Sequence, residues 1–138
     1  MFKKIFSYTK TVENSERAKI VVVYDASTEK QRDAIVRAFQ KENLQVRTST
    51  LDALTVNLKG NSIVYVVPGM NNGTVKHICR INKVLSISGN PAFAEKGDVS
   101  ISVAQEKGRP RIIINLEQLR LENQDVSSEL INLAKIVH

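Results

Sequence analysis

The residues best suited to metal binding or nucleophilic catalysis are two histidines and a single cysteine. His77 and Cys79 are two positions apart, whereas side chains that share a helix face are three or four apart. A nucleophilic Cys79 would need a base and an orienting group, and His77 is its only nearby candidate. His138 is the last residue. Because Gly-x-Ser-x-Gly and His-Glu-x-x-His are also absent, we predict no catalytic residue, no metal and no cofactor.

The glycine-containing loop from Gly69 to Gly73 is the best candidate for ligand binding. It lacks the Lys-Ser/Thr of a P-loop and the Gly-x-Gly-x-x-Gly spacing of a dinucleotide site. It nevertheless joins an expected strand to an expected helix, where open α/β sheets bind ligands and free N–H groups attract anions. The polar or small residues at these strand ends form a candidate ligand site: Asp25, Ser27, Gly69, Asn72, Thr74, Ser88 and Asn90. The alternative is an ordinary loop in which Asn72 or Thr74 caps the helix.

A phosphoacceptor site is not expected at these strand ends. That chemistry needs several carboxylates around a magnesium ion. Asp25 has no acidic neighbour there, since the next buried run ends in Val67-Pro68.

Apolar runs predict the strands. Residues 19–25, 62–67 and 112–114 are almost continuously apolar, as expected of strands covered on both faces. Residues 44–48 alternate and favour an edge strand, and residues 84–88 form a further strand. Residues 98–116 predict a β-hairpin with Gln105–Gly108 as its connector.

Helical periodicity appears between these runs. Residues 2–12 predict an amphipathic helix that packs on the sheet or, alternatively, binds a membrane surface. A helix begins near Thr28 and ends before Asn43, which tolerates the left-handed conformation. Its expected buried stripe is Ala34, Ile35, Ala38 and Phe39. Another helix spans roughly residues 74–82, and the final helix has Ser127 as N-cap. The expected core face of this final helix is Leu130, Leu133, Ala134 and Val137.

Alternating strands and helices predict an α/β fold with right-handed crossovers. We expect residues 1–138 to form a single three-layer domain with helices on both faces. Its sheet should be mostly parallel, with about six strands and a C-terminal antiparallel hairpin.

Composition is that of an ordinary globular domain, with 138 residues, 42% hydrophobic and 25% charged. The single Cys79 excludes an internal disulfide. No membrane span or signal peptide is visible. The net charge of +6 includes Lys76, Arg80 and Lys83 on one helical stripe, which leaves nucleic-acid binding as an alternative to a solvated face. Aromatic residues make up only 5%, so no base-stacking platform is predicted.

Five blocks of the C-terminal part have an order and spacing that resemble the YfiR/HmsC-like family. They are Val84-Leu85-Ser86-Ile87-Ser88, Phe93-Ala94-Glu95-Lys96-Gly97, Ile114-Asn115-Leu116, Ser127-Ser128-Glu129-Leu130 and Leu133-Ala134-Lys135-Ile136-Val137. Residues 2–12 look like the family's first helix, although the Trp-Pro that often closes it is absent. Cysteine pairs of some relatives cannot carry over to a chain with one cysteine.

The resemblance implies a periplasmic, non-enzymatic protein whose signal peptide has been removed. Such proteins restrain a membrane-bound diguanylate cyclase through its periplasmic sensor region, and release of the restraint raises cyclic-di-GMP and favours biofilm. The alternatives are a small-molecule-binding receptor lobe that uses the strand-end loops and a basic nucleic-acid-binding domain. Ile131 and Ile136 fall beside the final helix's core face, so we predict that they border an interface with a partner or a second copy. Alternatively, both pack under the first helix beside Phe2 and Phe6.

Overall fold

The computed structural model describes residues 19–70 and 73–138. The predicted first helix, residues 2–12, lies outside these described residues, as does Asn72 of the candidate ligand site. The alternative position for the two isoleucines, beside Phe2 and Phe6, therefore also lies outside them.

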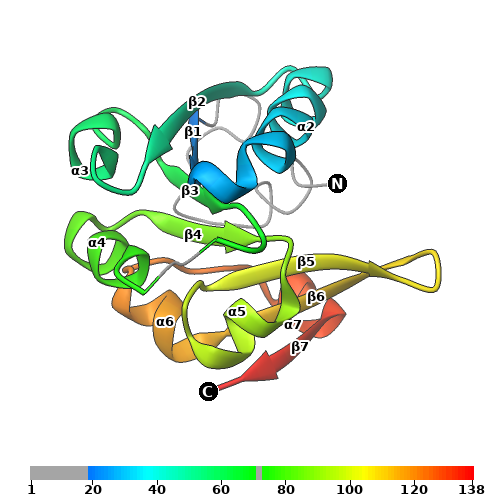
Figure 1. The fold of residues 1–138 in the computed structure, drawn as a ribbon. Coiled ribbons are helices and arrows are strands. Elements are labelled where there is room, and N and C mark those ends of the chain that lie inside the picture. Colours follow the sequence, from blue (N-terminus) through cyan, green and yellow to red (C-terminus); the bar gives the residue numbers. More distant parts are fainter. Residues whose placement is uncertain (1–18, 71–72) are drawn as a thin grey trace.

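The described residues contain a seven-stranded sheet in the order β2-β1-β3-β4-β5-β6-β7 (Figure 1). The strands are β1 (Lys19–Tyr24), β2 (Gln45–Thr50), β3 (Ile63–Val66), β4 (Leu85–Ser88), β5 (Ile101–Glu106), β6 (Arg109–Asn115) and β7 (Ala134–Val137). β5 and β6 pair antiparallel, and every other neighbouring pair is parallel. The predicted mostly parallel sheet with an antiparallel hairpin is confirmed, and the sheet has one strand more than expected.

Helices connect the strands and cover the sheet. They are the short 3-10 helix η2 (Ala26–Thr28), α2 (Glu29–Lys41), α3 (Leu54–Asn57), α4 (Val75–Asn82), α5 (Pro91–Lys96), α6 (Leu116–Leu121) and α7 (Ser128–Leu133). The chain crosses the sheet in one direction from β1 to β2 and in the other from β3 to β5. Right-handed crossovers therefore place α2 on one face and α4 and α5 on the other (Figure 1).

The C-terminal end of α2 follows from local chemistry, but its buried face does not. Asn43, directly after the C-cap Glu42, has a φ of 61°, so the predicted left-handed residue is confirmed. Phe39 is buried and Ile35 is partly buried as predicted, whereas Ala34 and Ala38 are exposed. The partly buried Val36 packs against the core instead. Isoleucine, valine and phenylalanine bury more apolar area than alanine, so they set the helix's rotation.

The prediction of a final helix reaching Val137 is wrong. α7 ends at Leu133, and residues 134–137 form β7, which pairs parallel with Ile112–Asn115. Leu130 is buried as expected, but Leu133 is 64% exposed. The β-branched Ile136 and Val137 suit a strand, and β6 offers unpaired backbone groups along its outer edge. Strand pairing therefore overrides the helical spacing.

Candidate functional site

A hollow of about 410 Å³ lies at the carboxyl ends of β1, β2 and β3. Asp25, Leu51, Met70, Gly73 and Thr74 line it. The strand order reverses between β1 and β3, since the chain runs from β1 to β2 in one direction and onward from β3 in the other. Open α/β sheets bind ligands at such a reversal. The structure therefore brings Asp25 and Thr74, two residues of the candidate ligand site, to one hollow.

Asp25 and its neighbours also start the first helical segment. Asp25 Oδ1 accepts hydrogen bonds from the Ser27 backbone N–H at 3.0 Å, from Ser27 Oγ at 2.6 Å and from Thr28 Oγ1 at 3.0 Å. This arrangement is a capping box for η2. Gly69, with a φ of 95°, makes the turn after β3 and approaches the Thr28 methyl group. Asp25 and Ser27 thus hold the local backbone at the rim of the hollow.

The remaining predicted residues, Ser88 and Asn90, do not line this hollow. Ser88 is buried, and its hydroxyl donates to the Val66 carbonyl at 2.7 Å. Asn90 caps α5 by accepting from the Ala92 N–H at 3.0 Å. A Cβ at Gly89 would lie 2.7 Å from the Tyr65 hydroxyl, so a larger residue there would displace the end of the Tyr65 side chain. Burial raises the pKa of Tyr65 to about 12.

The two predicted interface residues are placed on different elements. Ile131 lies on α7 and is 37% exposed. Ile136 lies on β7, where it is partly buried and packs against the core. Leu133, between them in sequence, is the more exposed side chain. Ile131 and Leu133 are the exposed apolar side chains of α7, but at two positions apart they do not share a helix face, and Ile136 contributes mainly to packing.

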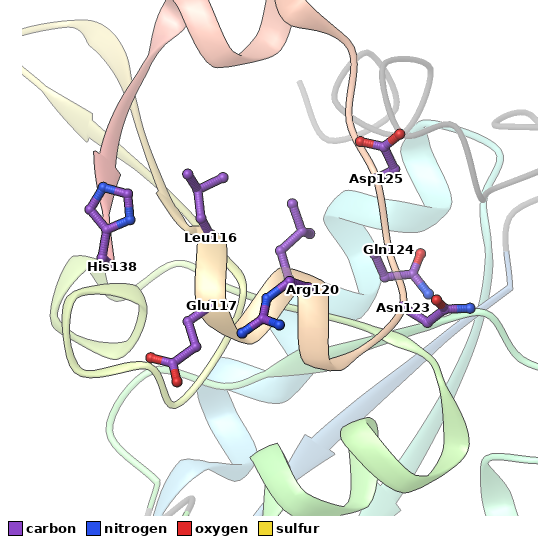
Figure 2. A pocket seen from close by; sticks show the side chains of 8 residues that line it. Leu116, Glu117, Arg120, Asn123, Gln124, Asp125 and His138 are labelled. Carbon is purple, nitrogen blue, oxygen red and sulfur yellow. The ribbon is translucent and has the colours of Figure 1, made fainter.

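A larger hollow, of about 720 Å³, lies beside α6. Figure 2 shows its side chains coming from α6, from the segment after it and from the C-terminal residue, with His138 and Asp125 at opposite ends. Leu116 and Leu119 supply apolar surface. Glu117, Asp125 and Arg120 place both charge signs in the lining, with the acidic side chains outnumbering the basic one.

One buried carboxylate, that of Glu122, is hydrogen-bonded to Ser86, Ser100 and Gln118 and so connects the end of α6 to β4 and to the residue before β5. Glu122, directly after α6, has no exposed surface. Its Oε1 accepts from the Ser86 backbone N–H at 3.0 Å and from the Ser100 hydroxyl. Its Oε2 accepts from Gln118 Nε2 at 2.7 Å and from the Ser86 hydroxyl. Four donors thus converge on one carboxylate inside the protein.

Burial controls the charge of the Glu122 carboxylate. Removing a carboxylate from water disfavours its ionised form. This desolvation outweighs the stabilising hydrogen bonds from Ser100, Ser86 and Gln118, and it raises the pKa of Glu122 to about 7. Burial and the nearby Glu122 charge also raise the pKa of the Cys79 thiol. Cys79 is therefore a buried, protonated side chain, which is the opposite of an activated nucleophile.

Sequence reasoning missed Glu122 because it lies in a polar segment, Leu121-Glu122-Asn123. The available signal was the alternation of serine with apolar residues in residues 84–88 and 98–103. Those serines are fully buried rather than facing water. Buried hydroxyl groups need hydrogen-bond partners, and the Glu122 carboxylate is the partner of two of them, those of Ser86 and Ser100.

The basic stripe of α4 is engaged within the protein. Arg80 Nε donates to Gln118 Oε1 at 2.7 Å, and Lys83 Nζ donates to the Leu121 carbonyl at 3.3 Å. Lys76 Nζ lies 4.0 Å from Asp98 Oδ1. The stripe therefore faces neighbouring parts of the chain, which weakens the nucleic-acid alternative.

Within residues 19–70 and 73–138, no group of three or more His, Cys, Asp or Glu side chains is arranged to hold a metal ion. None of the helices in these ranges combines the length and apolar character that crossing a bilayer requires. The described residues thus form an α/β fold with a mostly apolar core, one buried carboxylate and hollows open to solvent.

Comparison of the sequence with known protein families gives a match over nearly the whole chain. A family model described as YfiR/HmsC-like matches residues 1–135. The chain belongs to the YfiR/HmsC-like family, which confirms the resemblance seen in the five sequence blocks. No curated protein matches the sequence. Family membership supports, in general terms, a periplasmic regulator of diguanylate cyclase signalling, and it favours regulation over catalysis.

Proposed function

We propose that this protein restrains a membrane-bound diguanylate cyclase by binding its periplasmic sensor region. The observation that carries the proposal is the family match across residues 1–135, nearly the whole chain. Signals that weaken the contact would release the cyclase, raise cyclic-di-GMP and favour biofilm. The protein would act without a cofactor and without catalysing a reaction.

The apolar surface at α7 supports a contact of this kind. Ile131 and Leu133 are both exposed and lie within one short helix. Exposed apolar side chains such as these are available to a partner, although two residues at this spacing do not share one helix face. We place the cyclase contact, or a contact between two copies of this chain, at this helix.

The experiment co-expresses the protein, directed to the periplasm, with a diguanylate cyclase whose gene lies beside its own. Wild-type protein should lower cellular cyclic-di-GMP and co-purify with the cyclase. Ile131→Glu should abolish both effects while leaving the melting temperature unchanged. Val56→Glu is the matched control, since Val56 is 72% exposed on α3 at the opposite end of the sheet.

The variants Ile131→Glu and Ile136→Glu, made singly and together, distinguish a surface residue from a core residue. We expect Ile136→Glu to destabilise the protein, because Ile136 packs against the core. A changed mass in solution for Ile131→Glu would locate a homodimer contact at α7. Unaltered cyclic-di-GMP on expression of the wild-type protein would refute the proposed function.

A second candidate function is a receptor lobe for a small molecule. The hollow at the ends of β1, β2 and β3 favours it, because Thr74 there makes no side-chain capping bond. A bound metabolite should raise the melting temperature of the wild-type protein and shift amide resonances near Asp25, Gly69 and Thr74. Resonance shifts confined to the opposite ends of these strands would refute this site.

A further inference from the structure

A small hollow of about 230 Å³ lies at the amino ends of β1, β2 and β3, opposite the strand ends near Asp25 and Thr74. Three cationic side chains line it, those of Lys19, Arg47 and Lys59. Among the described residues that line it there is no aspartate or glutamate. This basic hollow, as we call it, therefore carries charge of one sign.

The pairing of β1 with β2 brings two of the cations together. Lys19 lies beside Gln45 in the parallel ladder, and Arg47 follows two positions along β2. Side chains two positions apart on a strand point to the same face, so Lys19, Gln45 and Arg47 share one face. Ser49 continues that face, and its hydroxyl accepts from Asn57 Nδ2 at 3.0 Å. The two cations therefore lie on the face of the sheet that α3 contacts.

The third cation belongs to the turn between α3 and β3, which hydrogen bonds hold in place. The Asn61 backbone N–H donates to the Leu58 carbonyl at 3.0 Å. Asn61 Nδ2 donates to the Asn57 carbonyl at 3.0 Å and to the Lys59 carbonyl at 3.2 Å. Gly60 has a φ of 78°, a left-handed conformation that glycine adopts without strain. The turn thus fixes the backbone of Lys59 beside the hollow.

No carboxylate of the described residues neutralises these cations. Lys19, Arg47 and Lys59 form no ion pair within residues 19–70 and 73–138. All three are exposed, so an ion can reach them from solvent. Like charges gathered at one hollow repel one another, and a bound anion would replace that repulsion with attraction.

We propose that the basic hollow binds a phosphate group, either free phosphate or the phosphate of a small ester or lipid headgroup. The Arg47 guanidinium can donate two parallel hydrogen bonds to phosphate oxygens, and the two lysines supply compact positive charges. The Gln45 side chain lines the same hollow and adds an amide donor. The volume is below the range of about 300–1,000 Å³ usual for drug-sized ligands, which favours a small anion.

A phosphate group fits this hollow better than a carboxylate or a nucleic acid does. A phosphate monoester carries a charge of about −1.5 to −2 at neutral pH, which three cations can balance. A carboxylate carries a single charge and would leave two of the cations without an anion. No aromatic side chain is among the residues that line the hollow, so stacked bases would find no platform.

The first test titrates the whole chain with inorganic phosphate at constant ionic strength, in a buffer free of other oxyanions. Amide resonances of residues 19, 45–47 and 59–61 should shift until they saturate. The melting temperature should rise with the phosphate concentration, because the ligand binds only the folded chain. Equal resonance shifts on addition of chloride would overturn the proposal, since they would report screening of charge alone.

Charge-removing variants locate the binding. Arg47→Gln and Lys59→Gln together should weaken phosphate binding about tenfold or more, because they remove two of the three cations. The matched control, Lys30→Gln and Lys41→Gln, removes two exposed charges from α2 and should bind like the wild-type protein. Equal affinity of the two double variants would overturn the proposal.

Arg47→Lys separates a built site from general attraction to anions. It keeps the positive charge but loses the planar pair of donors that matches phosphate oxygens. Phosphate binding should weaken about threefold or more. Unchanged affinity would overturn the role assigned to Arg47, because general attraction does not distinguish lysine from arginine.

Two further ligands identify the source of the phosphate. Binding of glycerol phosphate without binding to vesicles would support the proposal with a soluble ligand. Binding to vesicles of phosphatidic acid and phosphatidylcholine, but not of phosphatidylcholine alone, would support it with a lipid headgroup if the Arg47 and Lys59 double variant loses it. Tighter binding of a single-stranded oligonucleotide than of glycerol phosphate would overturn the proposal.

The basic hollow is separate from the contact proposed at α7. It lies at β2, whereas α7 leads into β7, and these two strands are the opposite edges of the sheet. The cyclic-di-GMP assay and the phosphate titration can therefore fail independently. If the wild-type protein leaves cyclic-di-GMP unchanged, the proposed function fails, and the titration still decides whether the hollow binds phosphate.

Discussion

Two kinds of strand meet in one sheet. β1 and β3 are apolar on both faces, and residues 112–114 of β6 are equally apolar, so hydrophobic burial holds these strands. β4 instead buries Ser86 and Ser88, and two more serines are buried at the start of the next strand, Ser100 just before β5 and Ser102 within it. The ladder between β4 and β5 covers only Ile87↔Ile101 and Ser88↔Ser102. Where that ladder is absent, Glu122 accepts hydrogen bonds from Ser86 and Ser100.

Because of this difference, we expect the apolar strands and the serine-containing strands to respond differently to mutation and to pH. Hydrophobic burial is non-directional and insensitive to pH. The serine seam, defined as Ser86, Ser100, Gln118 and Glu122, depends on directed hydrogen bonds and on the charge of one carboxylate. We therefore expect the apolar strands to fail through cavities and the serine seam to fail through pH or through single lost donors.

The largest effect should come from a cavity in an apolar strand. Ile113 is fully buried, as its position in the isoleucine run predicted. Ile113→Ala should lower the free energy of unfolding by about 2–5 kcal/mol, as for other buried large-to-small changes. Denaturant melts measure this loss. A loss below about 1 kcal/mol would contradict tight packing around β6.

The next effect distinguishes the serine seam by its pH dependence. The pKa of Glu122 rises from 4.5 to about 7 on folding, so the fold prefers the protonated form. Its contribution to stability is full below about pH 4.5 and is lost as the pH rises through about 7. Glu122→Gln cannot ionise. Between pH 4 and pH 8 the wild-type protein should lose about 3 kcal/mol relative to this variant.

Glu117→Gln is the control, because Glu117 is exposed on the same helix. Its stability should follow that of the wild-type protein at every pH. Parallel pH profiles for Glu122→Gln and the wild-type protein would show that folding does not raise the pKa of Glu122.

A smaller effect should follow the loss of one donor in the seam. Ser100→Ala removes a hydroxyl that donates to Glu122 and should cost about 1–3 kcal/mol. The loss should be greater at pH 8 than at pH 5, since an ionised carboxylate depends more on its donors. Ser128→Ala, at an exposed position of α7, should change stability by less than about 0.5 kcal/mol. Equal losses in the two variants would contradict the seam.

The smallest effect concerns two helix caps at the strand ends. Asn90→Ala removes the side-chain cap of α5 and should cost about 1 kcal/mol. Thr74→Ala should cost much less, because Thr74 makes no side-chain capping bond. Thermal melts of the two variants measure the difference. A similar loss for Thr74→Ala would mean that Thr74 serves the fold, which would weaken its assignment to the ligand hollow.

Local pattern alone predicted much of this protein. Unbroken apolar runs identified β1, β3 and the core of β6. The polar residues up to Gly108 identified the hairpin, although its connector is only Lys107-Gly108, since Gln105 and Glu106 belong to β5. Asn43 was predicted from its tolerance of the left-handed conformation, and the order of five blocks identified the family. Each of these features depends on residues that are close in sequence, or on block order within one chain.

Tertiary structure decided the rest. Residues 134–137 carry helical spacing, but the open edge of β6 offers them backbone partners, so they form a strand. Glu122 lies in a polar segment, yet it is buried against Ser86, 36 positions away. The candidate ligand residue Ser88 is buried and donates to the Val66 carbonyl, 22 positions away, rather than lining the hollow at Asp25 and Thr74. In each case the deciding partner is distant in sequence, and periodicity within a segment carries no information about which distant groups will meet it.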